Sequence, residues 1–468
     1  MNAFVDLHCH PTLKPYGQSF TKKQKGNSSD INDRNSVWYY DPPTVSDKLL
    51  NYLATLTRFS QANFQALCYG NVGIICASLY PIEIGFFKNK LPQGAVRREV
   101  NNFVTGVGDS RVEQVIKTND YFTDLEQEYK FLQQLDGQIF TIDSQDYQYK
   151  LISSYDDLNS IQAQTDNIFT VCVLLSIEGG HAFGCGIPGK NANKKVVLAN
   201  VAKVKSWQHR PLFIAIGHHF YNELCGHPKS LTGILGKVCD QSVGMNEGIT
   251  PLGYEVISLL LDNKNQQRIL IDIKHMSILA RNQYYQLLRQ EYAGQNIPIL
   301  VSHGGVTGIP SNTSNWFLNE SINFDDTDLL EIARSNGLFG IQLDERRIGS
   351  EQELKKTRGE ISRKKILYNW ARLVWRQIQH IAELLDRNNM FAWGIQCIGS
   401  DFDGIVNPIN GYWTEEEMQF LDDYLLKHAY NFINNPNSLR NDYNILSAEM
   451  IVNLVMYENA SSFIRKNY

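Results

Sequence analysis

The stretch AFVDLHCH, residues 3–10, starts as an apolar run of strand length and ends in two histidines separated by one cysteine. Because alternate side chains of an extended backbone point to the same side, His8 and His10 are expected to face one way. Seven more short apolar runs follow, and their lack of strict alternation is typical of strands that are buried on both faces. The predicted strands are Ala3–Leu7, Val72–Leu79, Ile168–Ile177, Leu212–Ile216, Ile269–Ile273, Ile297–Val301, Gly337–Leu343 and Ala392–Ile398.

Segments with helical periodicity separate most of these runs. Pro251 begins one of them, Asp325 or Asp326 caps another, and the longest covers roughly Ser362–Arg387. Repeated strand–helix units predict a parallel sheet, and eight of them predict a closed (β/α)8 TIM barrel. A last apolar helix, Glu449–Ile464, is expected to pack against the barrel exterior. Periodicity alone leaves a doubly wound open sheet as the alternative.

The length of 468 residues fits one decorated barrel domain, residues 1–468, because barrels of this class often carry insertions. Two stretches exceed a minimal barrel, residues 14–66 after the first strand and residues 81–166 after the second. Long loops that follow the strands of such a barrel often cover its active site. We therefore expect both insertions near the active-site mouth.

The composition restricts the kinds of partner. Hydrophobic residues make up 43% and charged residues 20% of the chain, as in ordinary globular proteins. A net charge of −5 argues against a basic surface for nucleic acid or for a membrane. A small-molecule substrate is the expected partner, and a homo-oligomer is an open alternative.

The cysteines and the first residues bear on the compartment. None of the eight cysteines belongs to a CxxC pair, and several lie in apolar runs, where free thiols act as small hydrophobic groups. The first residues lack a basic start followed by an apolar stretch, and no uninterrupted apolar segment of 18 residues occurs. The sequence therefore predicts a cytoplasmic protein.

Residues suited to metal binding follow five of the predicted strands, at the carboxyl ends where barrel enzymes place their active sites. Nitrogen and carboxylate donors suit a borderline cation such as zinc, and a bridging carboxylate can hold two ions about 3.5–4 Å apart. The sequence predicts one zinc ion bound by His8, His10 and Asp401 and a second bound by His275 and His303, with Glu178 bridging both.

Each of these residues also has a plainer interpretation. A lone HxH is often structural, Glu178 before two glycines fits a turn, and Asp401 fits a helix cap. Five strand ends that each carry a suitable donor favour a metal site over five separate coincidences.

The predicted ions would supply a nucleophile, because a hydroxide between them forms near neutral pH when the pKa of water falls from about 16 toward about 7. Asp401 would take its proton and pass it to the leaving amine. One of His218 and His219 is expected to polarise the scissile carbonyl, unless both pack in a loop. Arg346 and Arg347 either clamp a substrate carboxylate or phosphate or are solvated. The histidines expected to be structural or surface residues are His181, His209, His227, His380 and His428.

Four segments resemble the membrane (renal) dipeptidase family of the amidohydrolase superfamily. They follow one another from the third predicted strand towards the C-terminus, and IGSDFDG is the most specific. A terminal YENA, residues 457–460, is similar to the family's GGN. The segments are SIEG (176–179), GITPLG (248–253, similar to GLTPFG), IDIKHMS (271–277, similar to VDLSHVS) and IGSDFDG (398–404).

That resemblance implies a binuclear zinc barrel that hydrolyses dipeptides. It assigns Glu178 as the bridge and His275 and His303 as ligands. It also assigns Asp401 to proton transfer and His218 to polarising the substrate carbonyl.

Three features depart from the family pattern. His8-Cys9-His10 stands where the family has HxD, which lowers the negative charge of the site by one. The segment Ile322–Asp325 lacks the arginine with which the family grips the substrate's C-terminal carboxylate. The insertions are also larger than the family needs, so the substrate need not be a dipeptide.

The sequence thus predicts a binuclear metal-dependent hydrolase that cleaves an amide or peptide bond in a small substrate. A lactone, ester or phosphoester hydrolase is the enzymatic alternative, because the same metal pair stabilises those transition states. A metal-binding protein without turnover is the alternative from another class, and the presence of Asp401 argues against it.

Overall fold

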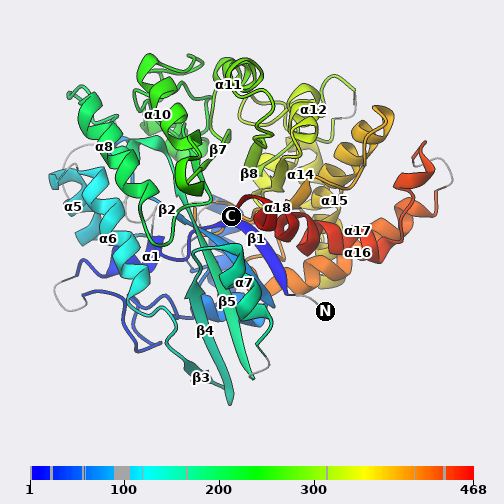
Figure 1. Cartoon of the computed structure of the whole chain (residues 1–468). Coiled ribbons are helices and arrows are strands. Elements are labelled where there is room, and N and C mark those ends of the chain that lie inside the picture. The colour runs from blue at the N-terminus through cyan, green and yellow to red at the C-terminus, as the bar shows by residue number, and fades with distance from the viewer. Residues whose placement is uncertain are drawn as a thin grey trace.

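Eight parallel strands close into a ring in the computed structural model, which describes residues 3–21, 25–54, 57, 59–88, 106–118, 120–164, 167–311, 315–404, 406–435 and 439–468. Neighbouring strands pair in the order β1, β2, β5, β6, β7, β8, β9, β10 and back to β1. The predicted (β/α)8 barrel is confirmed, and the open-sheet alternative is wrong (Figure 1). The strands are β1 (Phe4–Cys9), β2 (Val72–Leu79), β5 (Ile168–Glu178), β6 (Phe213–Ala215), β7 (Leu270–Asp272), β8 (Leu300–Gly304), β9 (Leu338–Ile341) and β10 (Gln396–Ile398).

Helices cover the outside of this ring, as the periodicity predicts. Thr250 caps α10 and Pro251 is its first residue, while Asp325 caps α12 with a capping box. The long helix begins at Arg363, one residue after the expected Ser362, which is its N-cap. The principal outer helices are α8 (Lys194–Lys205), α10 (Pro251–Leu261), α11 (Ile278–Glu291), α12 (Asp326–Arg334), α15 (Arg363–Arg387) and α16 (Met418–Ile433).

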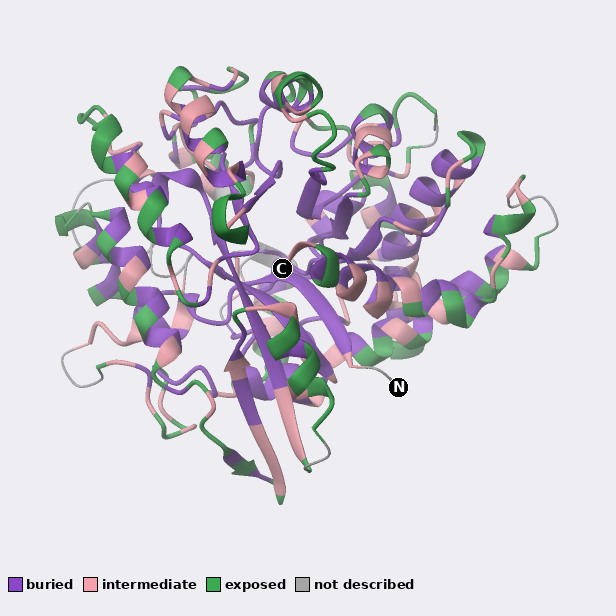
Figure 2. Ribbon diagram, viewed as in Figure 1, coloured by how far each residue is buried: buried purple, intermediate pink, exposed green. Residues whose placement is uncertain are grey.

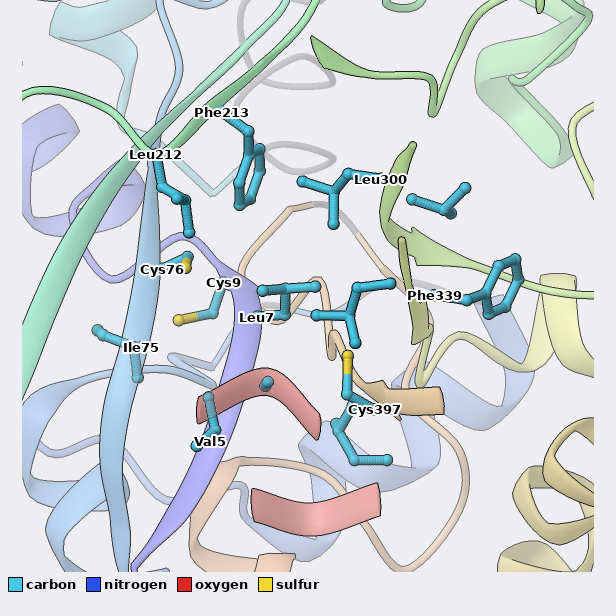
Figure 3. Close-up of a cluster of buried hydrophobic side chains, with 14 of the residues drawn as sticks. Val5, Leu7, Cys9, Ile75, Cys76, Leu212, Phe213, Leu300, Phe339 and Cys397 are labelled. Carbon is cyan, nitrogen blue, oxygen red and sulfur yellow. The ribbon is translucent and has the colours of Figure 1, made fainter. Parts of the chain in front are cut away.

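The interior of the barrel is a packed apolar core. Strand residues such as Leu7, Phe213 and Leu300 are at most 1% exposed and lie together within the ring (Figure 3). The eight cysteines are all free and buried, as expected for thiols in apolar strands. Figure 2 shows the same division, with buried residues on the strands and exposed ones on the outer helices. None of the helices in the described ranges is long and apolar enough to cross a membrane.

The predicted C-terminal helix forms as two helices, α17 (Ala448–Asn453) and α18 (Asn459–Asn467), joined by a π-helical turn at Leu454–Glu458. The Asn459 side chain donates to the backbone oxygens of Trp393 and Gln396 at 2.7 and 2.8 Å. Because Gln396 starts β10, this helix packs at the end of the barrel opposite to Asp401.

The first inserted segment, residues 14–66, contains α1 (Leu13–Gln18), α2 (Val45–Ala54) and the start of α3 (Phe64–Tyr69). Asp403, just beyond β10, anchors it. One carboxylate oxygen accepts from the Gln61 and Ala62 backbone N–H groups, both at 2.9 Å, and the other lies 2.7 Å from the Lys14 ammonium. This segment is therefore tied to the carboxyl ends of the strands.

The second inserted segment, residues 81–166, runs from one end of the barrel to the other. It starts at the carboxyl end of β2 and continues through α5 (Asp109–Thr118) and α6 (Tyr121–Gln133). The hairpin β3 (Phe140–Ile142) and β4 (Gln145–Leu151) then extends β5 beyond the ring, and α7 (Tyr155–Gln162) leads back (Figure 1). Among its described residues, those that directly follow β2 lie at the carboxyl ends of the strands, whereas the β3–β4 hairpin lies beside the opposite end of β5. The remaining short helices are α9 (Gly233–Val238), α13 (Glu345–Ile348) and α14 (Glu351–Thr357).

A buried carboxyl joins α6 to the barrel. Glu128 is 1% exposed, and it accepts hydrogen bonds from the Thr12 hydroxyl at 2.6 Å and the Tyr80 backbone N–H at 2.8 Å. Burial outweighs these hydrogen bonds and raises the pKa of Glu128 from 4.5 to about 7. The folded chain therefore holds a proton that the unfolded chain releases between pH 4.5 and 7.

The Glu128→Gln variant should unfold at a higher temperature than the unmodified protein at pH 8, and at nearly the same temperature at pH 5. The raised pKa means that this carboxyl costs stability as the pH rises from 4.5 through 7. The uncharged amide can accept from the Tyr80 backbone N–H and donate to the Thr12 hydroxyl oxygen. Thermal unfolding at both pH values measures the effect. Glu126→Gln, which removes a partly exposed carboxylate on the same helix, is the control. An equal shift at both pH values would contradict the expectation.

Candidate metal centre

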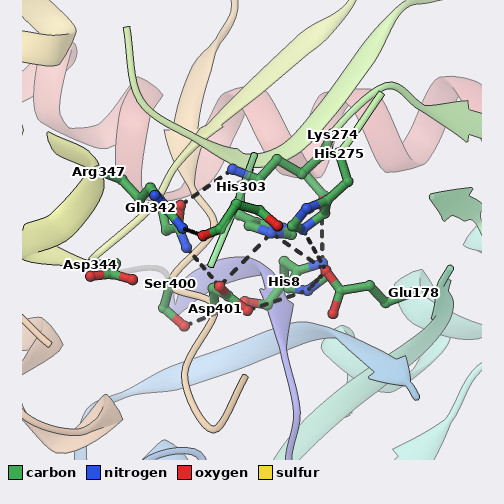
Figure 4. Close-up of polar contacts among 12 residues, drawn as sticks. His8, Glu178, Lys274, His275, His303, Gln342, Asp344, Arg347, Ser400 and Asp401 are labelled. Atoms are coloured by element: carbon green, nitrogen blue, oxygen red, sulfur yellow. Dashed lines mark hydrogen bonds and ion pairs between the residues drawn. The ribbon is translucent and has the colours of Figure 1, made fainter. Parts of the chain in front are cut away.

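Four imidazoles and two carboxylates from five strand ends meet at one buried point (Figure 4). The Glu178 carboxylate lies at its middle. One of its oxygens is 3.1 Å from His10 Nε2, and the other is 3.3 Å from His275 Nε2 and 3.5 Å from His303 Nε2. The structure therefore brings the predicted bridging residue between the predicted ligands of both ions.

Asp401 completes the cluster on the side of β1. Its Oδ1 atom lies 3.5 Å from His10 Nε2 and 3.7 Å from His8 Nε2, and its Oδ2 atom lies 3.8 Å from His303 Nε2. The two imidazoles of the HxH pair are themselves in contact, with their Nε2 atoms 3.1 Å apart. All six predicted ligands thus share one centre.

The backbone turns sharply where the strands deliver these groups. His275 and Asp401 have φ values of 66° and 61°, a left-handed conformation that is uncommon for residues other than glycine. Gly179, which follows Glu178, has a φ of 94°, and a Cβ there would lie 2.3 Å from the His181 ring. The chain therefore turns away directly after Glu178, the last residue of β5, and at His275 and Asp401, three residues beyond β7 and β10.

The protonation of the cluster suits a cation. Burial lowers the pKa of His275 to about 3 and that of His303 well below 6.5, so both rings are neutral and carry a lone pair. Burial opposes ionisation of Glu178, but the nearby imidazoles lower the pKa of that carboxyl well below 4.5. Burial also lowers the pKa of His10, but the Asp401 and Glu178 carboxylates outweigh it and raise that pKa to about 10. Imidazoles and carboxylates in contact are the donors that zinc and similar divalent ions prefer.

Ring nitrogens without partners also fit a metal site. Within the described ranges, His10 Nδ1 and His275 Nδ1 are buried and make no hydrogen bond. These two rings contact the cluster through their Nε2 atoms. The residues present fit divalent metal ions. The division into two ions stays a prediction.

His218 lies beside the cluster, with its Nε2 atom 3.6 Å from Glu178. Its Nδ1 atom is hydrogen-bonded to Glu83, which also accepts from the Phe220 backbone N–H at 3.2 Å. Burial lowers the pKa of His218, but the Glu83 and Glu178 carboxylates outweigh it and raise that pKa. His219 lines the same pocket, with Nδ1 2.7 Å from the Ser230 hydroxyl. Both histidines therefore face the pocket.

Glu83 is a residue that the sequence does not single out. It lies four residues beyond β2, at the start of the second inserted segment, in no recognisable motif. Glu83 contacts His218 only because the loop after β2 folds over it, and no local sequence pattern predicts that contact.

The pocket beside the cluster has two kinds of wall. The cationic wall comes from Lys274, Arg346 and Arg347. The apolar wall comes from Phe86 and from the residues before and within α9. The lining residues are Phe86, Glu178, His218, His219, Ser230, Leu231, Thr232, Leu235, Lys274, His275, Gln342, Asp344, Arg346, Arg347, Asp401 and Gly404.

The two predicted arginines are both in this pocket but differ in their partners. Arg346 donates to both carboxylate oxygens of Asp344, at 3.0 Å from Nε and 2.6 Å from Nη2, so its charge is neutralised. Arg347 is 5% exposed and donates from Nη2 to the Ser230 backbone oxygen at 2.5 Å. Its Nη1 atom is buried and has no hydrogen-bond partner among the described residues. Arg347 is therefore not solvated.

Lys274 and Gln342 add two groups that the sequence did not predict. Lys274, beside His275, is 1% exposed, and its ammonium lies 3.5 Å from the Gln342 side-chain oxygen. The Gln342 amide in turn donates to Asp401 Oδ2 at 2.6 Å. Burial, together with the nearby Arg347, lowers the pKa of Lys274 to about 7. The motif IDIKHMS contains this lysine where the resembling family has serine, which was the available signal.

The five histidines expected to be structural all make buried contacts elsewhere. Each has a ring nitrogen bonded to the backbone oxygen of Pro81, to Tyr129, to the backbone oxygens of Pro228 and Val243, to Asp326, or to the backbone oxygen of Tyr368. In the same order they are His181, His209, His227, His380 and His428.

Comparisons with known proteins support the fold. No protein-family model and no curated protein matches the sequence. A solved metallopeptidase described as the dipeptidase AC is 14% identical, with 90% of this chain and 94% of that chain covered at a TM-score of 0.51. A metallopeptidase from Rhodobacter sphaeroides, solved with a phosphinate mimic of the dipeptide L-Ala-D-Ala, is 13% identical. That match covers 100% of this chain and 99% of the other at a TM-score of 0.53. At these identities the likeness shows a shared fold, and the fold implied by the resemblance to renal dipeptidases is confirmed.

Proposed function

We propose that this chain, which shares its fold with solved metallo-dipeptidases, is a metal-dependent hydrolase that cleaves an amide or peptide bond in a small substrate. The observation that carries the proposal is the convergence of four imidazoles and two carboxylates beside a pocket with cationic side chains. Fold alone does not determine function, so the argument rests on this site.

The donor set suits two divalent ions, and zinc matches its nitrogen and oxygen ligands best. Such ions, when bound, lower the pKa of water to give a nucleophile and polarise the scissile carbonyl. We assign His8, His10 and Asp401 to one ion, His275 and His303 to the other, and Glu178 to both.

Asp401 is the residue proposed to move the proton. Gln342 donates to its Oδ2 atom at 2.6 Å, which fixes the carboxylate while Oδ1 faces His8 and His10. A carboxylate held in this way can take a proton from the attacking water and give it to the leaving amine. His218, which Glu83 holds through Nδ1, presents Nε2 for the substrate carbonyl oxygen.

The cationic wall is proposed to hold an anionic group of the substrate. Among the described residues, Arg347 has an unused donor and no carboxylate within hydrogen-bond distance, whereas Asp344 already occupies Arg346. This assigns the predicted clamp to Arg347 and gives Arg346 the indirect task of holding Asp344. A dipeptide or an N-acyl amino acid carries a carboxylate that fits the free donor.

Elemental analysis of the purified protein should find about two zinc equivalents per chain. Dipeptides and N-acyl amino acids should be hydrolysed faster than lactones and phosphoesters, and a chelator should abolish that activity, because the nucleophile depends on the ions. A panel of these substrate classes, assayed with and without chelator, measures both. Faster hydrolysis of a lactone or phosphoester would move the assignment to the alternative enzyme, and a metal-free protein would overturn both.

The arginine assignment has a matched pair of variants. Arg347→Gln should raise KM for a carboxylate substrate about 10-fold or more, since a hydrogen bond to a charged group contributes about 1.5–3 kcal/mol. Arg346→Gln should change KM less, because Asp344 already neutralises that guanidinium. The substrate's carboxamide analogue should be insensitive to Arg347→Gln. An equal KM for carboxylate and carboxamide in the unmodified protein would contradict the proposed clamp.

A phosphoester hydrolase is the second candidate. Lys274 and Arg347 line the same pocket, and two cationic side chains also suit a phosphate group. The panel above decides between the two, since the phosphoester would then turn over faster than the amides.

A further inference from the structure

Two aspartates beneath the candidate metal centre make the same set of hydrogen bonds, one to Ser302 in β8 and the other to Ser400, two residues beyond β10. Asp272, the last residue of β7, accepts from the Lys274 and Ser302 backbone N–H groups at 2.9 and 3.1 Å through Oδ1. Its Oδ2 atom accepts from the Ser302 hydroxyl at 2.5 Å. The carboxylate thus joins the carboxyl end of β7 to β8, directly before the ligands His275 and His303.

Asp6 on β1 repeats this pattern. Its Oδ1 atom accepts from the His8 and Ser400 backbone N–H groups at 3.1 and 2.8 Å, and its Oδ2 atom accepts from the Ser400 hydroxyl at 2.5 Å. The buried Glu415 carboxyl also contacts this hydroxyl, at 3.2 Å. In both places the serine is the residue before a ligand, so the aspartate fixes the proposed ligands of two adjacent strands together.

Each aspartate–serine pair lies behind the proposed ligands of one ion. Asp6 and Ser400 lie beneath the His8, His10 and Asp401 side, and Asp272 and Ser302 lie beneath the His275 and His303 side. Ser302 also joins the two sides. Its hydroxyl oxygen is 3.0 Å from His8 Nδ1 and 2.9 Å from His303 Nδ1.

The hydrogen bonds of Ser302 determine which nitrogen of the His8 and His303 rings carries a proton. A serine hydroxyl has one proton to donate and two lone pairs to accept with, and an ionised carboxylate only accepts. The proton therefore goes to Asp272, and the His8 and His303 rings must each donate from Nδ1–H to the hydroxyl oxygen. Both Nε2 atoms are then left with a lone pair, and both face the Glu178 carboxylate, at 3.7 and 3.5 Å. Two lone pairs beside a carboxylate attract a cation, which is a metal ion at the loaded site and a proton in its absence.

We propose that Asp6–Ser400 and Asp272–Ser302 are positioning pairs that each hold one half of the metal centre, and that Ser302 sets the Nδ1–H tautomer of His8 and His303. The inference rests on the proposed metal-dependent function and names four residues that act on it through the ligands. Groups behind metal-bound histidines set ring orientation, and their loss typically costs 10- to 100-fold in metal affinity.

Zinc titration of the full chain tests the pairs. Ser302→Ala should weaken both zinc equivalents by about 10- to 100-fold, because Ser302 contacts rings of both halves. Ser400→Ala should weaken mainly one. Ser78→Ala and Ser176→Ala are matched controls, since these serines are buried in β2 and β5 and their hydroxyls make no hydrogen bond within the described part of the chain. Unchanged zinc affinity in a folded Ser302→Ala variant would overturn the proposal.

A second measurement needs no serine variant. A long-range ¹H–¹⁵N spectrum of the histidine-labelled full chain, before and after removal of metal, reads the tautomer of each ring. The signals are assigned by their loss in His8→Gln and His303→Gln. Both rings should be protonated at Nδ1 in both states, and a neutral ring that carries its only proton at Nε2 would overturn the proposal. If the unmodified protein binds no zinc, the proposed function fails, while the metal-free spectrum still decides the tautomers.

Discussion

Replacing Asp401 by asparagine should lower kcat by about 10²- to 10⁴-fold, the range that general acid–base groups contribute. The amide keeps an oxygen towards His8 and His10 but has no basic site for the proton of the attacking water. The other five ligands remain, so zinc content should change far less than turnover, and KM should stay within a few fold. Steady-state kinetics beside elemental analysis separate the two effects.

Asp403→Asn is the natural contrast, because this residue lies in the same motif but faces away from the ligands. It holds Lys14 and the Gln61 and Ala62 backbone, so its replacement should lower the unfolding temperature and leave the turnover of folded protein within a few fold. If Asp401→Asn and Asp403→Asn reduced kcat equally, Asp401 would have no special part in proton transfer.

Replacing Glu178 by glutamine should have the largest effect on metal binding. Its two oxygens face His10 on one side and His275 and His303 on the other, so it is the ligand proposed to contact both ions. An amide keeps one oxygen donor and loses the negative charge. Zinc affinity and kcat should therefore each fall by more than 100-fold, beyond the 10- to 100-fold typical of residues behind the ligands.

The control for this variant is Glu255→Gln, which removes an exposed carboxylate that pairs with Lys194 on the surface. It should bind zinc and turn over substrate as the unmodified protein does, because surface ion pairs contribute little. Two tightly bound zinc equivalents in Glu178→Gln would show that this carboxylate is not the bridge.

The barrel and the proposed ligands could be predicted from the sequence because both depend on short local patterns of apolar and polar residues. Each buried strand is an apolar run, and each proposed ligand lies within a few residues of the end of such a run, as Glu178, His303 and Asp401 do. Parallel strands bring their carboxyl ends to one rim, so the strand order was sufficient to place these residues together without any knowledge of long-range contacts.

The contacts within the walls of the pocket could not be predicted from the sequence in the same way. Glu83 reaches His218 from a loop after β2, and the difference between Arg346 and Arg347 depends on Asp344 and on the Ser230 backbone. Such contacts join loops that are distant in sequence. The strand ends were also less regular than expected, since β6 covers only Phe213–Ala215 where a run to Ile216 was predicted.

The origin of the catalytic and the selective groups differs, and this has a consequence for engineering. The proposed metal ligands all come from strand ends, whereas Phe86, Leu231 and Leu235 of the apolar wall come from connecting segments that contribute none of them. Exchanging these segments for those of another barrel should thus change the substrate specificity and leave metal binding unchanged. Directed evolution of the chain has its natural starting library at these three positions.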